Sequence, residues 1–280
     1  MNFNKSFKYL LVLVILSIIS CCRTNDDPEE INTQISDVIK FKAKYMEFPR
    51  PLTYLPNESE PEIVELEYNN KGQVVKKNGD VLFMSASSGV PYVFSKTICA
   101  QIHYDNDKII IEKKLYDPNV YSNYRKEIYM NNNQIEKSIK YSASDSPSIR
   151  DTVVYTYNNQ KVTKTIKRNI YPREESLYYY TEDNLDSIVT RGYRYDPVTD
   201  EEYIDYNAKG RDKVIFSNYD KYSNPTKKLI VFDETYFRSL SKNNYQKIIF
   251  KSIWDDGSVH STYEESWNLK YKNGQVDFSQ

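Results

Sequence analysis

Hydrophobic and polar residues alternate along much of the chain, and one short pattern recurs within this alternation. An aromatic residue is followed by a turn rich in Asn, Asp or Gly, then by an aliphatic residue and usually a lysine. Copies of the pattern read LEYNNKGQVVKK, IHYDNDKIIIEKK, IYMNNNQIEKSIKY, TYNNQKVTKTIKR, YYTEDNLDSIVTR and LKYKNGQVDF. The last aromatic residues before the turns of four copies are 25, 28 and 23 residues apart, at Tyr104, Tyr129, Tyr157 and Tyr180. A period of this length indicates a repeated supersecondary unit, and a strand, a tight turn and a second strand make a β-hairpin.

The repeats therefore predict an all-β fold. We expect a meandering antiparallel sheet of successive hairpins, strongly curved, in which strands that follow each other along the chain are neighbours. Whether the sheet closes partly into a barrel is left open by the sequence. Turns are expected at Asn69–Gly72, Asp105–Asp107, Asn131–Asn133, Asn158–Gln160 and Lys272–Gly274.

The same alternation assigns side chains to faces. It places Tyr263, Trp267, Leu269 and Tyr271 on one face of a strand, and Ile135, Ile139 and Tyr141 on one face of another. Helical periodicity is nearly absent after the N-terminal stretch. Only DETYFRSLSKNN is expected to hold one helical turn, with Asp233 as its cap.

The N-terminal stretch follows a different pattern. It has 14 uncharged residues between Lys8 and Arg23, whereas a membrane-spanning helix needs about 20. Lysines in front of an apolar centre that ends in small residues are typical of a secretory signal peptide. Residues Ile18 to Cys21 resemble the lipobox of bacterial lipoproteins.

That resemblance implies cleavage before Cys21 and a lipid on its sulfur. Two or more acyl chains at Cys21 would anchor the protein stably to a membrane. Two alternatives stay open, an ordinary secretory signal and modification of Cys22. The expected organisation is a signal peptide at 1–20, a lipidated polar tether at 21–35 and a repeat-built antiparallel β domain at 36–280.

The Tyr/Asn hairpins resemble those of Bacteroidetes-type cell-envelope lipoproteins, a group without an assigned activity. NYDKYSNPTKKL and SLSKNNYQKIIF resemble recurring features of that group. A more distant likeness is to the YD repeats of Rhs-type proteins, whose regular glycines this chain mostly lacks. The resemblance implies an envelope lipoprotein. Because Cys22 and not an aspartate follows the anchor, we expect the outer membrane. The acidic run at 26–30 resembles surface-export signals and favours the cell surface over the periplasmic face.

The amino-acid composition limits the kinds of partner that the chain is expected to bind. The predicted signal peptide contains two of the 38 basic residues, which leaves 36 against 39 acidic residues and a formal charge of −3. This balance gives no support for a nucleic-acid partner. Tyrosine is frequent, with 27 residues, and glycine is scarce, with 7. We therefore expect Asn to supply the left-handed positions of the turns.

No catalytic, metal or cofactor set emerges from the sequence. Cys99 and His103 share one face of a predicted strand, but four residues along a strand span about 13 Å, too far for a catalytic pair. His260 could approach Cys99 only across the fold. The oxygen-rich stretches YDNDK and WDDGS lack the spacing of a calcium loop and suit tight turns. We expect no catalytic residue, no bound metal and no cofactor.

The expected function is a non-enzymatic binding module for an extended glycan or protein. Tyrosines on the sheet would provide the surface. Trp254, beside the WDDGS turn, is the expected ligand contact, whereas Trp267 is expected in the core. The alternatives are a structural envelope component without a small ligand and a hydrolase on a β scaffold. A porin is disfavoured because lysines and glutamates occur on both faces of the predicted strands.

Overall fold

The computed structural model describes residues 37–47, 54–55, 62–83, 92–115, 124–141, 149–169, 173–196, 198–203, 211–254 and 256–280. All of them belong to one compact unit, Ile35–Gln280. The predicted signal peptide 1–20, the predicted tether 21–35 and its lipid site Cys21 lie outside the described residues. Within the described part of the chain, no helix is long and apolar enough to cross a membrane.

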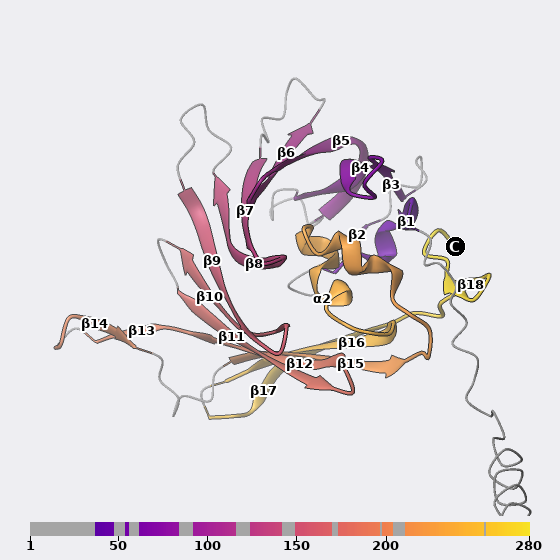
Figure 1. Cartoon of the computed structure of the whole chain (residues 1–280). Helices are drawn as coiled ribbons and strands as arrows, with labels where there is room; N and C mark the ends of the chain where they lie inside the picture. Colours follow the sequence, from indigo (N-terminus) through magenta and orange to yellow (C-terminus); the bar gives the residue numbers. More distant parts are fainter. Residues whose placement is uncertain are drawn as a thin grey trace, which may run out of the picture. The chain divides into compact units, whose positions relative to one another are not determined.

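One meandering sheet of 15 strands dominates the fold (Figure 1). Its path runs from β1 through β3 to β12 and then to β15, β16 and β17, and every step is antiparallel. The short strand β2 pairs in parallel with β5, while β13–β14 and β18–β19 form small sheets of their own. The predicted all-β meander of hairpins is confirmed, and the sheet is open. The elements are β1 (Lys40–Lys42), η1 (Ala43–Tyr45), β2 (Tyr54–Leu55), β3 (Ile63–Tyr68), β4 (Val74–Phe83), β5 (Tyr92–Asp105), β6 (Lys108–Leu115), β7 (Tyr124–Asn131), β8 (Gln134–Tyr141), β9 (Ile149–Asn158), β10 (Lys161–Asn169), β11 (Glu174–Thr181), β12 (Asn184–Gly192), β13 (Arg194–Asp196), β14 (Glu201–Tyr203), β15 (Arg211–Tyr219), η3 (Pro225–Leu229), η4 (Asp233–Thr235), α2 (Tyr236–Ser239), β16 (Tyr245–Ile253), β17 (Val259–Ser266), β18 (Tyr271–Lys272) and β19 (Gln275–Val276).

Tight turns close the hairpins at all five predicted positions. In four hairpins both turn residues have positive φ: Asn132–Asn133, Asn159–Gln160, Glu182–Asp183 and Asn273–Gly274. Two positive φ values in a two-residue loop are typical of a type I′ turn, whose twist matches the flanking strands. Asn tolerates this conformation better than most residues, which explains how a glycine-poor chain builds so many hairpins.

A β-bulge follows the turn in four of the hairpins. The strand register shifts there, so that Val75, Glu136, Thr163 and Asp186 are extra residues without an opposite partner. The aliphatic residue just before each bulge is at most 3% exposed: Val74, Ile135, Val162 and Leu185. The bulge reverses the faces beyond it. The prediction that Ile135 and Ile139 share a face is therefore wrong, and Ser138 is the buried residue on that strand, at 2% exposure.

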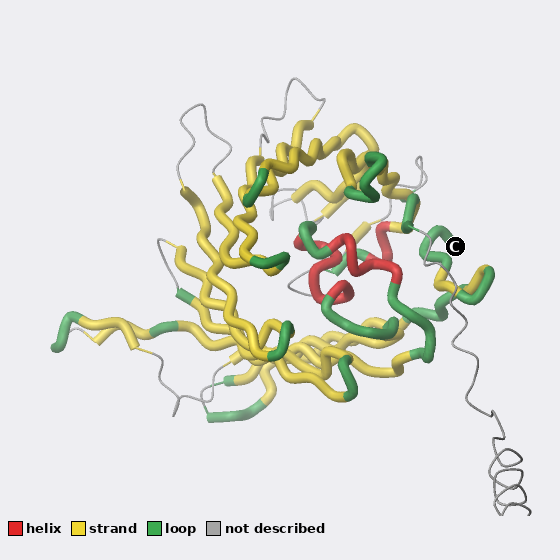
Figure 2. The backbone as a smooth tube through the Cα atoms, in the orientation of Figure 1, coloured by secondary structure: helices red, strands yellow, loops and turns green. Residues whose placement is uncertain are grey.

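The connection between β15 and β16, residues 220–244, folds back against the sheet. We call it the central segment; it contains η3, η4 and α2, around which the strands curve (Figure 2). It contacts distant strands, since the rings of Tyr236 and Tyr155 lie 6.1 Å apart and Ser241 Oγ accepts from Leu185 N–H at 3.1 Å. The expected helical turn is present as α2. Asp233 does not cap it, because Asp233 begins η4 and its carboxylate binds lysines instead.

The C-terminal residues leave the main sheet after β17. Trp267 is 7% exposed and its Nε1–H donates to Lys44 O at 2.8 Å. Phe278 O accepts from Lys42 N–H at 2.8 Å, so this segment also reaches β1. The expected core position of Trp267 is confirmed. The prediction that Tyr263 to Tyr271 continue one strand face is wrong, because β17 ends at Ser266 and Tyr271 begins β18.

Candidate binding surface

Three of the four repeat tyrosines, Tyr104, Tyr157 and Tyr180, pack against the core, whereas Tyr129 OH donates to Glu127 Oε2 of its own strand at 2.8 Å. Tyr104 OH donates to Val74 O at 3.0 Å, and Tyr157 OH accepts from Ile135 N–H at 3.1 Å. In each case, the tyrosine of one hairpin bonds the backbone of the buried aliphatic residue in the preceding hairpin. Burial raises the pKa of Tyr104 to about 12. These tyrosines hold successive hairpins together and are not presented to a ligand.

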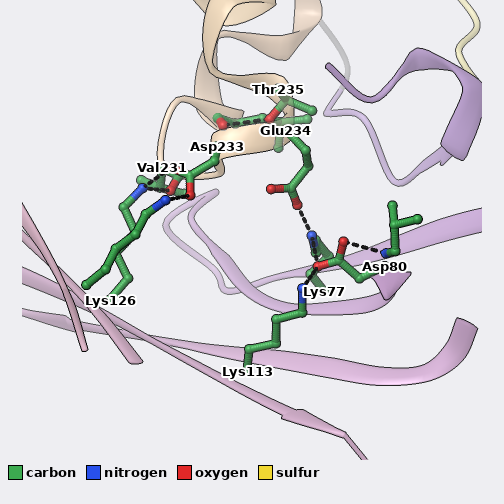
Figure 3. A network of polar contacts seen from close by, with 11 residues as sticks. Lys77, Asp80, Lys113, Lys126, Val231, Asp233, Glu234 and Thr235 are labelled. Atoms are coloured by element: carbon green, nitrogen blue, oxygen red, sulfur yellow. Dashed lines mark hydrogen bonds and ion pairs between the residues drawn. The ribbon is translucent and has the colours of Figure 1, made fainter. Parts of the chain in front are cut away.

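A polar cavity of about 220 Å³ lies between the central segment and the first half of the sheet (Figure 3). Lys77, at 2% exposure, donates to Asp80 Oδ2 at 2.9 Å and also contacts Glu234 of the central segment. Lys113 reaches the same Asp80 oxygen at 2.7 Å. Burial alone would raise the pKa of Asp80, but the charges of Lys77 and Lys113 outweigh it and lower the pKa to about 2.

A second group of ion pairs lines the same cavity. Asp233 binds Lys126 of β7 at 2.7 Å and Lys140 of β8 at 2.6 Å. Lys126 also donates to Val231 O at 3.1 Å, and burial lowers its pKa. The four ammonium groups of the cavity each contact a carboxylate, so the charges largely compensate one another. The arrangement fixes the central segment to β4, β7 and β8.

The structure separates the groups considered for catalysis. Cys99 is buried in β5, whereas His103 is exposed on the same strand. His260 lies on β17 and its ring packs against Trp254, with centroids 4.2 Å apart. Among the described residues, no three His, Cys, Asp or Glu side chains come together as a metal site.

Trp254 lies in the tight turn between β16 and β17. The turn is closed by hydrogen bonds from Trp254 N–H to Ser258 O and from Gly257 N–H to Trp254 O, both at 2.8 Å. Asp256 Oδ1 accepts from Ser258 N–H at 2.7 Å, and Gly257 adopts φ +88°. The indole is 54% exposed, as expected from the sequence. Its contact with His260 orients the ring while leaving much of it open to solvent.

The two ends of the main sheet differ. One end carries the tight hairpin turns and the central segment. We call the other the loop end, from which the chain leaves the sheet after β4, β6, β8, β10, β12 and β16. Thr190 opposes Asp212, and Asp212 opposes Ser252. The connection after β12 and the Trp254 turn therefore leave the sheet at this same loop end. Loops held by a rigid scaffold are the usual location of binding residues.

The hairpin β13–β14, which we call the arm, adds further exposed hydrophobic residues at the loop end (Figure 1). Tyr195, Val198 and Tyr203 are 53%, 91% and 46% exposed. Tyr195 opposes Glu202 whereas Tyr203 opposes Arg194, so the two rings lie on opposite faces of the ribbon. A two-stranded ribbon is marginally stable alone. The arm therefore offers apolar surface that a partner could cover.

Solved structures of porin-like proteins from Bacteroides are similar to most of this chain. No protein-family model matches the chain, and no curated protein matches it. A porin-like protein from Bacteroides vulgatus aligns at 14% identity and a TM-score of 0.45, over 79% of this chain and 86% of its own. A porin-like protein from Bacteroides uniformis aligns at 10% identity and a TM-score of 0.40, over 77% and 85%. Both TM-scores lie below 0.5, so this likeness decides nothing about function.

Proposed function

We propose that the chain is a non-enzymatic binding module of the bacterial cell envelope that holds an extended partner at its loop end. One observation carries the proposal. Hydrophobic side chains are exposed at the loop end, at Trp254 and on the arm, whereas the face that curves round the central segment is filled by tyrosines and ion pairs.

Of the two partners considered, an extended glycan fits this surface better than a polypeptide does. A flat indole that is half exposed can stack on a sugar ring, and neighbouring carboxylates such as Asp256 can accept hydrogen bonds from hydroxyl groups. Small molecules prefer enclosed pockets, and the Trp254 turn is open. A polypeptide is the alternative, because tyrosine and tryptophan are also enriched at protein interfaces.

The location is part of the proposal. Its support is the likeness of residues 18–21 to a lipobox, which would put a lipid on Cys21 and hold the domain at the outer membrane. The acidic run that follows favours the surface face. The sheet and its loop end would then be tethered where envelope glycans and proteins are concentrated.

An array of envelope glycans and envelope proteins tests the binding role. The parent chain should bind at least one extended polymer, and Trp254→Ala should weaken that binding by about tenfold, the effect of losing one stacked ring. Tyr179→Ala is the matched control, because Tyr179 is 48% exposed on β11 away from the loop end. Silence across the array would favour the structural component, and cleavage of an arrayed polymer would favour the hydrolase.

A further inference from the structure

The main sheet ends in strand β17, whose outer edge has no partner among the described residues. Seven of its eight residues are exposed, and it contains neither lysine nor proline, two of the residues that commonly protect an edge. The opposite edge strand β1 differs. It has three residues, two of them lysines, and Phe278 O accepts from its Lys42 N–H. Of the two edge strands that the structure describes, β17 is therefore the longer and the more open to pairing.

The residue that follows β17, Trp267, shows which backbone N–H and C=O groups of the strand point toward β16 and which point away from it. Trp267 N–H donates to Gln246 O of β16 at 2.8 Å. Backbone groups alternate in direction along a strand, so those of Ser266, Glu264 and Thr262 point away from β16. Their N–H and C=O groups have no partner in the described part of the chain. They form a regular row to which another strand can bond.

We propose that β17 pairs antiparallel with β17 of a second copy of this chain. Outward-pointing residues must face one another across the new interface, which restricts the alignment. Placing Glu264 opposite Glu264 of the second copy would oppose like charges and is unfavourable. Placing Thr262 opposite Glu264 avoids this, and each such pair exchanges two main-chain hydrogen bonds.

Tyr263 supports this alignment. Its ring lies 6.1 Å from the ring of Phe250 on β16, while the other side is open, so that Tyr263 is 38% exposed. With Thr262 opposite Glu264, Tyr263 faces Tyr263 of the second copy across the two-fold axis. Directly opposite aromatic residues in non-hydrogen-bonded positions stabilise antiparallel pairs. In the dimer, the ring of Tyr263 would therefore pack between Phe250 of its own chain and Tyr263 of the second copy.

The charges of the edge also fit a second copy. Glu264 is ion-paired with Lys247 at 2.6 Å, so its charge is already compensated within the chain. In the proposed alignment Glu265 opposes Ser261, and no two charges of like sign lie directly opposite. A foreign strand would need its own complementary sequence, whereas a second copy supplies it by symmetry.

Cysteine crosslinking of the full chain in detergent tests the proposal. In a Cys22→Ser background, Tyr263→Cys should give a disulfide-linked dimer on oxidation, because the two positions oppose each other at the axis. Thr262→Cys in the same background should crosslink several-fold less, since residue 262 opposes residue 264. The background without an added cysteine sets the level contributed by other thiols.

A proline variant separates edge pairing from chance collision. Adding Thr262→Pro to Tyr263→Cys removes an outward N–H and should reduce the crosslink several-fold, while Thr262→Ser should not. Circular dichroism checks that both variants keep the parent fold. Sedimentation of the parent should show a monomer–dimer equilibrium that Thr262→Pro shifts to monomer.

Three results would overturn the proposal. These are a monomer at every concentration, equal crosslinking at residues 262 and 263, or crosslinking of residue 263 in cells to a different protein without a homodimer. None of them bears on ligand binding at Trp254, so this proposal and the proposed function can fail separately.

Discussion

At the scale of single residues, Asp80 shows how the polar cavity stabilises the fold. Its carboxylate is shared by Lys77 and Lys113, and the side chains of Lys77 and Asp80 are only 3% and 9% exposed. Removing one member of a buried ion pair leaves the other charge uncompensated, which costs more than the pair contributes.

Asp80→Asn should therefore lower the free energy of unfolding by about 3 kcal/mol, measured by chemical denaturation. The matched control is Asp183→Asn, which breaks the exposed Lys161–Asp183 pair and should have little effect. A similar small effect for both variants would show that the cavity network contributes no stability.

The buried carboxyl group of Glu47 predicts a pH dependence of the stability of the fold. Its side chain is buried, Oε2 accepts from Phe237 N–H at 2.8 Å, and burial raises its pKa to about 8 despite the nearby charge of Arg238. Between pH 4.5 and about 8 the folded chain then holds a proton that the unfolded chain has lost. This contribution to stability is complete below pH 4.5 and disappears as the pH rises through 8.

Thermal unfolding across that window should give a midpoint that falls with rising pH in the parent. Glu47→Gln, which cannot ionise, should flatten the fall. An equally steep fall in Glu47→Gln would mean that another group causes the dependence.

At the scale of elements, the hairpin is the unit that the chain repeats. The hairpin β9–β10 combines a left-handed turn, a bulge and a tyrosine that bonds the neighbouring hairpin, whereas the other copies have one or two of these features. Gln160 is a weak point, because it adopts φ +64° although it carries a Cβ that this conformation disfavours.

Gln160→Gly should raise the free energy of unfolding by up to about 1 kcal/mol, because glycine adopts positive φ without strain. The adjacent Lys161→Gly is the control. Lys161 lies in β10, where glycine should cost about 0.5–1 kcal/mol. Destabilisation of the same size at both positions would refute the turn assignment.

The hairpins were predictable from the sequence because their turns depend on local residues such as Asn132 and Asn133. The bulges were not, because an extra residue is defined only by the opposite strand; Glu136 looks like any other strand residue. Buried charges such as Lys77 and Lys126 were also missed, because the carboxylates that they contact on the central segment lie 157 and 107 residues away in the chain. The sequence feature that could have indicated these buried lysines is the presence of lysine on both faces of the predicted strands. The exposure of Trp254 was predictable because a tryptophan beside a turn is exposed for local reasons.

At the scale of the whole molecule, the proposed function combines a lipid anchor at Cys21 with a binding surface at the loop end. Cys21→Ala should abolish lipid labelling and move the protein from the membrane fraction to the soluble fraction. The measurement is fractionation of cells with metabolic acyl labelling, and Cys22→Ala is the control that should keep the anchor. Membrane association as firm as that of the parent would show that Cys21 is not the lipid site.

The most direct test of the central claim, that the loop end binds the partner, is the fluorescence of Trp254. The chain has two tryptophans, and Trp267 is buried, so the difference between the spectra of the parent and Trp254→Phe isolates the emission of Trp254. Saturating amounts of the polymer retained on the array should shift this emission to shorter wavelength and reduce its quenching by acrylamide. The Trp254→Phe spectrum should not change. A parent spectrum that stays the same at saturation, or a shift that persists in Trp254→Phe, would contradict the account.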